Sequence, residues 1–436
     1  MTALHFRPIG VAGLIAIAAC GGNLLNVEHP DVIEPGNLLG ETGAAALYQG
    51  ARSEFIAAHD GGTVALGLVY VSGLFTDEFI FPATPPELIS IDRRDNQSTS
   101  GTIGDVFFRL HRARNAAERA AAALAALPSA ATDPRIGEVE ALGALVYSLF
   151  GETFCSGVPF STIENAEVVP GSSVTTPEMF TQALSRLDAA AAKAGGNADI
   201  VNLIRVSKGR VLMNLNRYPE AATAVAQVPT SFRFDNTHTT ADPASVNQIK
   251  VNMWDSFFLG MGNQEGTNGL DYVTANDPRI ESVDAGISGF DLQTEVLRSV
   301  KYQAGDAAVT MASGIEARMI QAEAALKAGD LAGWLGRLNE ARATTTLAPL
   351  SDPGTLTERV NLTFRERAFW MYGTAHRLGD LRRLVTQYGR NAESVFPTGD
   401  YHKDNLQRAK QVSLLVPQTE ENNPKFNRSA CDPTKA

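Results

Sequence analysis

The sequence predicts a mostly α-helical fold in which paired helices support a large irregular, loop-rich half. Alanine is abundant and often stands beside Leu, Glu and Arg. This favours helix because alanine loses no side-chain entropy on folding. Several segments carry apolar residues at the three- and four-residue spacing of one helix face. Between two such segments, residues 229–310 are instead rich in Asn, Gly, Thr and Asp, which is typical of loops.

The composition is that of a water-soluble globular protein with an acidic surface. The chain has 436 residues, of which 44% are hydrophobic and 19% are charged, and its formal net charge is −11. An acidic surface repels a phosphate backbone, so the sequence argues against a nucleic-acid partner. After the N-terminal segment, no stretch reaches the roughly 18 consecutive apolar residues of a membrane-spanning helix.

The N-terminus is predicted to be a lipoprotein signal peptide over residues 1–19. A short head with Arg7 precedes an apolar run that is too short to span a bilayer and ends in Ile-Ala-Ala before Cys20. Small residues before a cysteine resemble a bacterial lipobox, in which the cysteine takes the lipid and anchors the protein to a membrane. Residues 20–40 are then a lipid tether and extended entry segment. The alternative is an ordinary signal peptide followed by a chance cysteine.

Two further cysteines, Cys155 and Cys431, complete the cysteine set. In an oxidising exported setting they are candidates for a disulfide, because extracellular compartments favour such bonds. The sequence does not give the distance between them. Two separate thiols, one of them buried, therefore remain the alternative.

Helical periodicity marks the elements in order along the chain. It predicts single helices over about 40–59, 63–76, 105–127, 135–150 and 177–194, helix pairs over 199–228 and 315–343, and helical structure over 355–390. The helix after residue 175 has Thr176 as its expected cap, followed by Pro177 and then an acidic residue in the first turn. Prolines predict a long loop over 77–103 and an irregular tail over 391–436.

The two helix pairs have the spacing of tetratricopeptide repeats. From Gly209 onward, large and small residues recur at the repeat spacing, and the small ones fall where two antiparallel helices touch. Pro229 is predicted to end the second helix of this pair. Residues 315–343 repeat the design but carry Trp334 where such a repeat usually has alanine. Each pair cannot bury its apolar face alone, so stacking of several pairs is expected. Trp334 and Trp370, both on predicted helices, are expected to lie in the core.

Six segments together resemble the SusD/RagB family of nutrient-uptake outer-membrane lipoproteins, in the order in which the family has them. They are residues 26–37, 151–159, 276–279 with the sequence Asn-Asp-Pro-Arg, 317–342, 364–384 and 416–424. Two departures stand out. An insertion containing Cys155 lengthens the second segment, and Thr374 and Ala375 interrupt the Gly-His step of the fifth.

The resemblance implies a tetratricopeptide-like α/α superhelix of about four helix pairs, with residues 41–436 as one binding domain carrying loop-rich insertions at about 77–103 and 229–310. It implies a non-enzymatic protein, lipid-anchored in the outer membrane and facing the extracellular side. Family members cover a TonB-dependent, SusC-like barrel and deliver an oligosaccharide or peptide ligand to it. The implied partners are therefore the barrel, the ligand and the membrane.

The two insertions contain the residue types that bind sugars. A glycan site needs aromatic platforms for the C–H faces of the rings, and planar polar groups for the hydroxyls. The candidate ligand residues are Trp254, Tyr272, Asn252, Asp255, Asn268, Phe79, Arg93 and Asn96. The aromatic candidates and Arg93 each have a structural alternative, since large aromatic residues are usually buried and surface arginines usually solvated or ion-paired.

Catalytic and metal-binding signals are absent from the sequence. No metalloprotease or serine-hydrolase motif occurs, and the histidines lack metal-ligand spacing. No cofactor is predicted; structural calcium in the Asp/Asn-rich loops stays open, although no loop has EF-hand spacing. Acid pairs such as Asp77-Glu78 keep a secreted glycoside hydrolase as a minor alternative. The other alternative is a helical-repeat adapter for proteins. The basic cluster in 364–384 is predicted to be structural, with Arg377 and Asp380 spaced for a local ion pair.

Overall fold

The structure, a computed structural model, describes residues 40–62, 65–164 and 167–436. The predicted signal peptide, Cys20 and nearly all of the tether lie outside these residues, as does the family-like segment 26–37, so those predictions stay predictions. Among the helices that are described, none is both long enough and apolar enough to cross a membrane.

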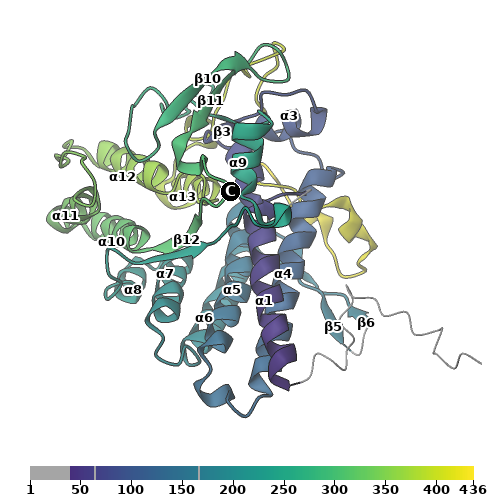
Figure 1. The fold of residues 1–436 in the computed structure, drawn as a ribbon. Helices are drawn as coiled ribbons and strands as arrows, with labels where there is room; N and C mark the ends of the chain where they lie inside the picture. The colour runs from purple at the N-terminus through teal and green to yellow at the C-terminus, as the bar shows by residue number, and fades with distance from the viewer. Residues whose placement is uncertain (1–39, 63–64, 165–166) are drawn as a thin grey trace, which may run out of the picture.

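Four helix pairs form the scaffold in the described part of the chain (Figure 1). The pairs are α1 (Gly40–His59) with α4 (Gly101–Ala125), α5 (Pro134–Thr153) with α6 (Thr176–Ala191), α7 (Ala198–Asn214) with α8 (Tyr218–Ala224), and α10 (Gly314–Ala328) with α11 (Leu331–Arg342). Successive pairs touch through α4 and α5, α6 and α7, and α8 and α10. The predicted mostly α-helical, tetratricopeptide-like fold is therefore confirmed.

The irregular half contains short helices and two-stranded antiparallel ribbons. The helices outside the four pairs are α2 (Leu68–Phe75), α3 (Pro86–Asp92), α9 (Gln248–Lys250), α12 (Leu356–Trp370) and α13 (Arg377–Tyr388). The ribbons join β1 (Gly61–Gly62) to β2 (Ala65–Leu66), β3 (Phe79–Ile80) to β9 (Gly260–Met261), β4 (Val158–Pro159) to β7 (Ser173–Val174), β5 (Thr162–Glu164) to β6 (Glu167–Val169), β8 (Arg233–Asn236) to β12 (Val309–Ser313), and β10 (Ser282–Ser288) to β11 (Glu295–Ser299).

Several element boundaries differ from the sequence prediction. The helix expected over 63–76 is the shorter α2, which begins at Leu68. The segment 77–103 is not one loop, because it contains β3 and α3, and α4 already begins at Gly101 behind the Ser100 cap. The cap of α6 is Thr175, whose side chain and that of Glu178 form a capping box, and the helix starts at Thr176. The predicted helix over 355–390 is broken between α12 and α13, where Gly373 and Ala375 have φ of 66° and 61°. Left-handed backbone stops a helix.

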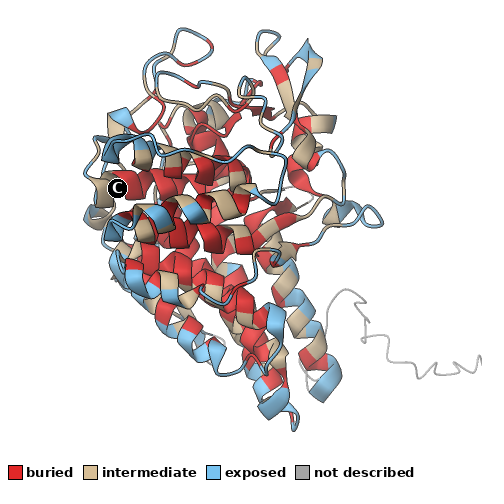
Figure 2. Ribbon diagram, turned by 90° about the vertical axis from the view of Figure 1, so that its left-hand side faces the viewer, coloured by how far each residue is buried: buried red, intermediate tan, exposed pale blue. Residues whose placement is uncertain are grey.

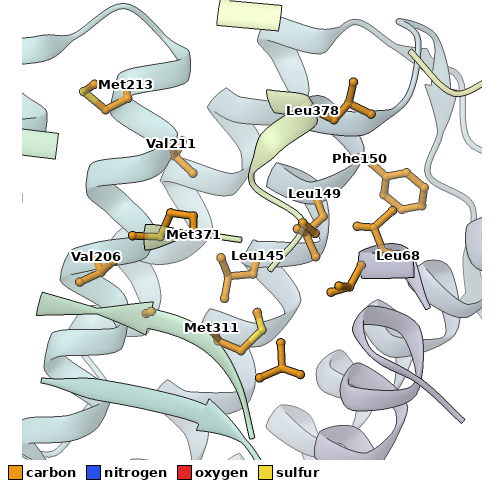
Figure 3. Packing of buried hydrophobic residues seen from close by; sticks show 14 of the residues in the cluster. Leu68, Leu145, Leu149, Phe150, Val206, Val211, Met213, Met311, Met371 and Leu378 are labelled. Atoms are coloured by element: carbon orange, nitrogen blue, oxygen red, sulfur yellow. The ribbon is translucent and has the colours of Figure 1, made fainter. Parts of the chain in front are cut away.

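The core lies where the helix pairs meet the irregular half. Figure 2 shows buried residues concentrated there and exposed residues on the outer helix faces. Helix α5 is buried on nearly all sides, which explains its nearly continuous apolar sequence. In Figure 3, Leu145 and Leu149 of α5 lie beside Met371, Leu378 and Met311 from the later part of the chain. Because these contacts join distant segments, the irregular half is held by the scaffold.

Gly209 of α7 fits the repeat pattern, and Trp334 of α11 departs from it but is buried as expected. A Cβ atom on Gly209 would lie 2.5 Å from Val225 Cγ1, so only glycine permits this helix contact. Trp334 is fully buried, as expected, and its indole N–H donates to Thr363 Oγ1 at 2.8 Å. The larger ring in place of alanine thus packs toward the neighbouring α12.

A disulfide joins Cys155, just after α5, to Cys431 in the C-terminal tail. The two Cα atoms are 5.0 Å apart although the residues are separated by 276 positions. The backbone N–H of Cys155 also donates to the carbonyl oxygen of Leu414, so the tail is held at two points. Closing so long a loop stabilises the folded state by up to about 5 kcal/mol in the chain-entropy description.

Candidate ligand-binding site

Three of the predicted ligand residues are buried inside the protein. Phe79 and Tyr272 pack their rings against Tyr372, with centroid distances of 5.5 and 5.1 Å. Asn96 is 1% exposed and uses its amide to hold residues of the C-terminal tail, including the carbonyl oxygen of Ser413. Side chains without accessible surface do not contact a ligand, so the prediction for Phe79, Tyr272 and Asn96 is wrong. Tertiary packing fills these positions.

Two more predicted residues bind the protein's own backbone. The side-chain amide of Asn268 donates to the carbonyl oxygens of Glu393 and Phe396 at 2.7 and 2.9 Å. Arg93 donates from Nε to the carbonyl oxygen of Gln407 at 3.0 Å. Both therefore fasten the tail to the irregular half. The structure gives both side chains a structural contact within the protein.

The remaining three candidates lie together at one π-helical turn, Val251–Asp255. Trp254 is partly exposed, and its indole N–H donates to the carbonyl oxygen of Ser299 at 3.0 Å. Asn252 is partly buried and donates to Gln248 O, while Asp255 is exposed and pairs with Lys250 at 2.7 Å. The structure thus brings Trp254, Asn252 and Asp255 into one surface region.

Aromatic rings and an arginine surround that turn. The guanidinium of Arg298 lies 4.3 Å from the ring centre of Trp254 and 5.9 Å from that of Phe257. Phe258 packs on Phe290 with 4.5 Å between ring centres, and Phe290 is 56% exposed. We call these five residues the aromatic patch. Phe257 has φ of 54°, a conformation that bulky residues rarely adopt and that is concentrated at functional sites.

Sequence reasoning missed Phe290, in the turn between β10 and β11, and Arg298 of β11; both lie within the insertion 229–310 but were not among its candidate ligand residues. This ribbon is pinned through Asp291, which accepts hydrogen bonds from Thr294 and pairs with Lys403 at 3.2 Å. Burial alone would raise the pKa of Asp291, but these partners outweigh it and lower the pKa to about 2. The carbonyl oxygen of Phe258 is likewise fixed by Tyr70 Oη at 2.8 Å. The patch therefore sits on an ordered support.

Known structures share this architecture although the sequences have diverged. No family model matches the sequence, and no curated protein does so either. A SusD superfamily protein from Bacteroides fragilis superimposes with a TM-score of 0.64 at 16% identity, over 88% of this chain and 98% of that chain. One from Parabacteroides distasonis gives 0.65 at 12% identity, over 88% and 98%. A SusD-like carbohydrate binding protein from Bacteroides fragilis gives 0.63 at 13% identity, over 89% and 99%.

The chain has the SusD fold. Similarity at this level of identity concerns the arrangement of the backbone. Within this SusD fold, the aromatic patch lies in the irregular half and not on the helix pairs. The four pairs support the irregular half, and the irregular half carries the exposed rings of the aromatic patch.

The basic cluster of residues 364–384 is structural in this SusD fold, as predicted. Arg367 makes two hydrogen bonds of 2.9 Å to Asp380. The predicted pair of Arg377 with Asp380 is wrong, because Arg377 reaches Asp77 instead, with both contacts at 2.7 Å. The partner of Arg377 is therefore 300 positions away and not on the same helix. This ion pair links α13 to the loop before β3.

The acid pair Asp77-Glu78 does not resemble a hydrolase site. Asp77 is buried against Arg377, and Glu78 is 1% exposed. Burial raises the pKa of Glu78 to about 8; the N–H of Gly373, donating to Oε1 at 2.9 Å, lowers it only in part. Neither carboxyl faces solvent, so neither can meet a substrate. In the described residues no group of three or more His, Cys, Asp or Glu is arranged to hold a metal ion, and calcium elsewhere stays an open expectation.

Proposed function

We propose that this SusD-fold chain is a non-enzymatic glycan-binding lipoprotein of the cell surface. It captures an oligosaccharide and delivers it to a TonB-dependent, SusC-like barrel in the outer membrane. The observation that carries the proposal is the aromatic patch, in which exposed ring surface and a guanidinium lie together on the irregular half. Similar solved structures described as SusD-like carbohydrate binding proteins add support.

The chemistry of the patch suits a sugar ring. Phe290 and Trp254 offer flat apolar surface for the C–H faces of a pyranose. Arg298, and Asn252 in the same turn as Trp254, offer planar groups that hydrogen-bond hydroxyl oxygens. Because a sugar presents both kinds of surface at once, a mixed patch binds it better than either kind alone.

Phe290→Ala is expected to weaken oligosaccharide binding about fivefold to tenfold, since one ring–sugar contact is of the size of an aromatic pair, about 1 kcal/mol. A glycan array identifies the ligand, and isothermal titration calorimetry measures the loss. Phe108→Ala is the matched control, because Phe108 is also an exposed phenylalanine, 45% accessible, but lies on α4. Equal losses in both variants would contradict a specific role for the patch.

Two competing functions give different results in the same assays. If residues 23–436 bind no oligosaccharide or peptide but retain other proteins, the chain is a helical-repeat adapter. If the purified protein releases product from a polysaccharide, and an acid-to-amide change abolishes the release, it is a glycoside hydrolase. Binding without turnover supports the proposal.

Lipid attachment at Cys20 is tested separately. Mass spectrometry of the mature protein is expected to find acyl chains on an N-terminal Cys20, and the protein is expected in the outer-membrane fraction. Cys20→Ser is expected to move it to the soluble fraction, because two or more acyl chains supply the membrane affinity. An unmodified mature cysteine would contradict the anchor. Release of the Cys20→Ser protein without loss of glycan binding would show that anchor and ligand site are independent.

A further inference from the structure

A cavity lies between the later helices and the β8–β12 ribbon, and none of its lining residues belongs to the aromatic patch. Its volume is about 450 Å³, within the range of small-molecule pockets. It is lined by residues of β8, β12, the start of α10 and the end of α12, which adjoin in Figure 1. Its lining includes Arg233, Arg279, Lys301, Thr310, Glu316, Trp370 and Thr374.

Trp370 was expected to lie in the core, and it does pack against the core. The residue is only partly buried, however, and it lines the cavity. The indole nitrogen itself is buried and has no hydrogen-bond partner among the described residues. Buried N–H groups nearly always have a partner, so an orphaned one beside a cavity points to a missing acceptor. Arg279 supports the ring, with its guanidinium 4.9 Å from the ring centre.

Lys301 is the one cation lining the cavity that has no carboxylate within ion-pair distance in the described structure. Its Nζ donates to the carbonyl oxygen of Tyr372 at 2.7 Å, which leaves further N–H groups for another acceptor. The other two cations lining the cavity are already paired. Arg233 lies 3.1 Å from Asp235, and Arg279 contacts both Asp277 and Glu366. The cavity therefore contains one uncompensated positive charge.

The oxygen atoms around the cavity are already engaged. Thr310 accepts a hydrogen bond from Arg233, and Thr374 donates its hydroxyl to Met371 O. Glu316 is held by Arg210 at 2.7 Å and by His376 at 3.2 Å. The groups that lack partners are thus N–H donors, and one carries a charge. Such a set binds an acceptor that is negatively charged.

We propose that this cavity binds the carboxylate of a uronic acid residue, with Lys301 and the Trp370 indole N–H as its two donors and the Trp370 ring beside the sugar. The class of ligand rests on the proposed function, which makes the chain a glycan binder. The acidic character rests on the donors of the cavity alone. The cavity shares no lining residue with the aromatic patch, so variants of each test the two sites independently.

The titration of Lys301 supplies a second readout. The pKa of Lys301 is lowered to about 8, mainly by desolvation. The positive charge of Arg233 also lowers it, whereas the carboxylates of Glu78 and Asp235 raise it. Lys301 therefore carries its charge at pH 7 and loses it as the pH rises through about 8. Affinity for a carboxylate is expected to fall over the same interval.

The experiment measures binding of D-galacturonic acid and of neutral D-galactose to the full chain purified in detergent, by calorimetry and tryptophan fluorescence. Galacturonic acid is expected to bind at least about tenfold more tightly than galactose, the size of one charge-assisted contact. Lys301→Met is expected to remove that difference. Trp370→Phe, which deletes the unpartnered N–H but keeps an aromatic ring, is expected to weaken binding roughly fivefold, and its unfolding curve is measured beside that of the unaltered chain. Lys193→Met, a surface lysine paired with Glu140, is the matched control and should change nothing.

Several outcomes would overturn the inference. One is equal binding of the acid and the neutral sugar; another is galacturonate binding that Lys301→Met leaves unchanged. If a tripeptide carboxylate binds in a Lys301-dependent way and galacturonate does not, the acidic-sugar class is wrong. Neutral oligosaccharide binding that depends on Phe290, without Lys301-dependent acid binding, would overturn this inference while leaving the proposed function standing. Failure of all sugars at both sites would overturn the proposed function as well.

Discussion

Replacing Asp77 with alanine is expected to lower the free energy of unfolding by about 3–5 kcal/mol, the cost of breaking a buried ion pair by removing one partner. Asp77 accepts two hydrogen bonds of 2.7 Å from Arg377 and one from the backbone N–H of Leu270. Without the carboxylate, a guanidinium would remain buried with no counter-charge. The contact also joins α13 to the loop before β3, so its loss is expected to loosen the irregular half.

Urea denaturation of the purified protein measures this effect. Asp255→Ala is the matched control, because Asp255 forms a surface ion pair with Lys250 and its side chain is 48% exposed. Exposed pairs of this kind contribute about 0–1 kcal/mol. The double variant Asp77→Ala/Arg377→Met should recover part of the loss, since it removes the uncompensated charge. Similar losses for Asp77→Ala and Asp255→Ala would refute the structural role given to the buried pair.

Glu78→Gln is expected to change how stability depends on pH. Burial raises the pKa of Glu78 from the unfolded value of 4.5 to about 8. The folded state therefore holds a proton that the unfolded state releases, and this contribution is present below pH 4.5 and lost as the pH rises to about 8. The total loss is about 3–5 kcal/mol, at about 1.4 kcal/mol for each pH unit. Glutamine cannot lose the proton, so the variant gains stability relative to the natural protein across that interval.

Chemical denaturation at several pH values between 4.5 and 8 tests this expectation. Glu316→Gln serves as the opposite case. Glu316 is also buried, but Arg210 and His376 outweigh its desolvation and hold its pKa well below the usual range. Its contribution is present above the unfolded pKa and is lost as the pH falls, so Glu316→Gln should destabilise the protein at neutral pH. A Glu78→Gln variant whose stability runs parallel to the natural protein at every pH would contradict the protonated Glu78.

Local sequence signals were enough to find most helices. α1 lies where its pattern of apolar residues placed it, and the pairs α7–α8 and α10–α11 follow from Gly209, Pro229 and the repeat spacing. Helix periodicity depends on neighbours three and four residues away, so it is readable without the fold. The short strands were missed because a two-residue ribbon such as β3–β9 is defined by a partner far along the chain.

Ligand residues could not be selected in the same way. Trp254 and Tyr272 look alike in sequence, since both are aromatic residues in a polar, loop-rich segment. The structure leaves Trp254 at the surface and buries Tyr272 to 1% exposure between other rings. Phe290 and Lys301 gave no local signal. Whether a ring is exposed or a charge lacks an ion-pair partner depends on which distant segments pack beside it.

The sequence by itself determined the helical scaffold, the predicted lipobox at Cys20 and the composition of the irregular half, because each depends on residue type and short-range spacing. Tertiary structure alone decided that Arg377 meets Asp77, that Cys155 meets Cys431 and that Trp370 borders a cavity. Burial, ion pairing and the choice of surface arise from contacts between segments hundreds of residues apart. These contacts are set by the packing of the whole chain, which no local pattern records.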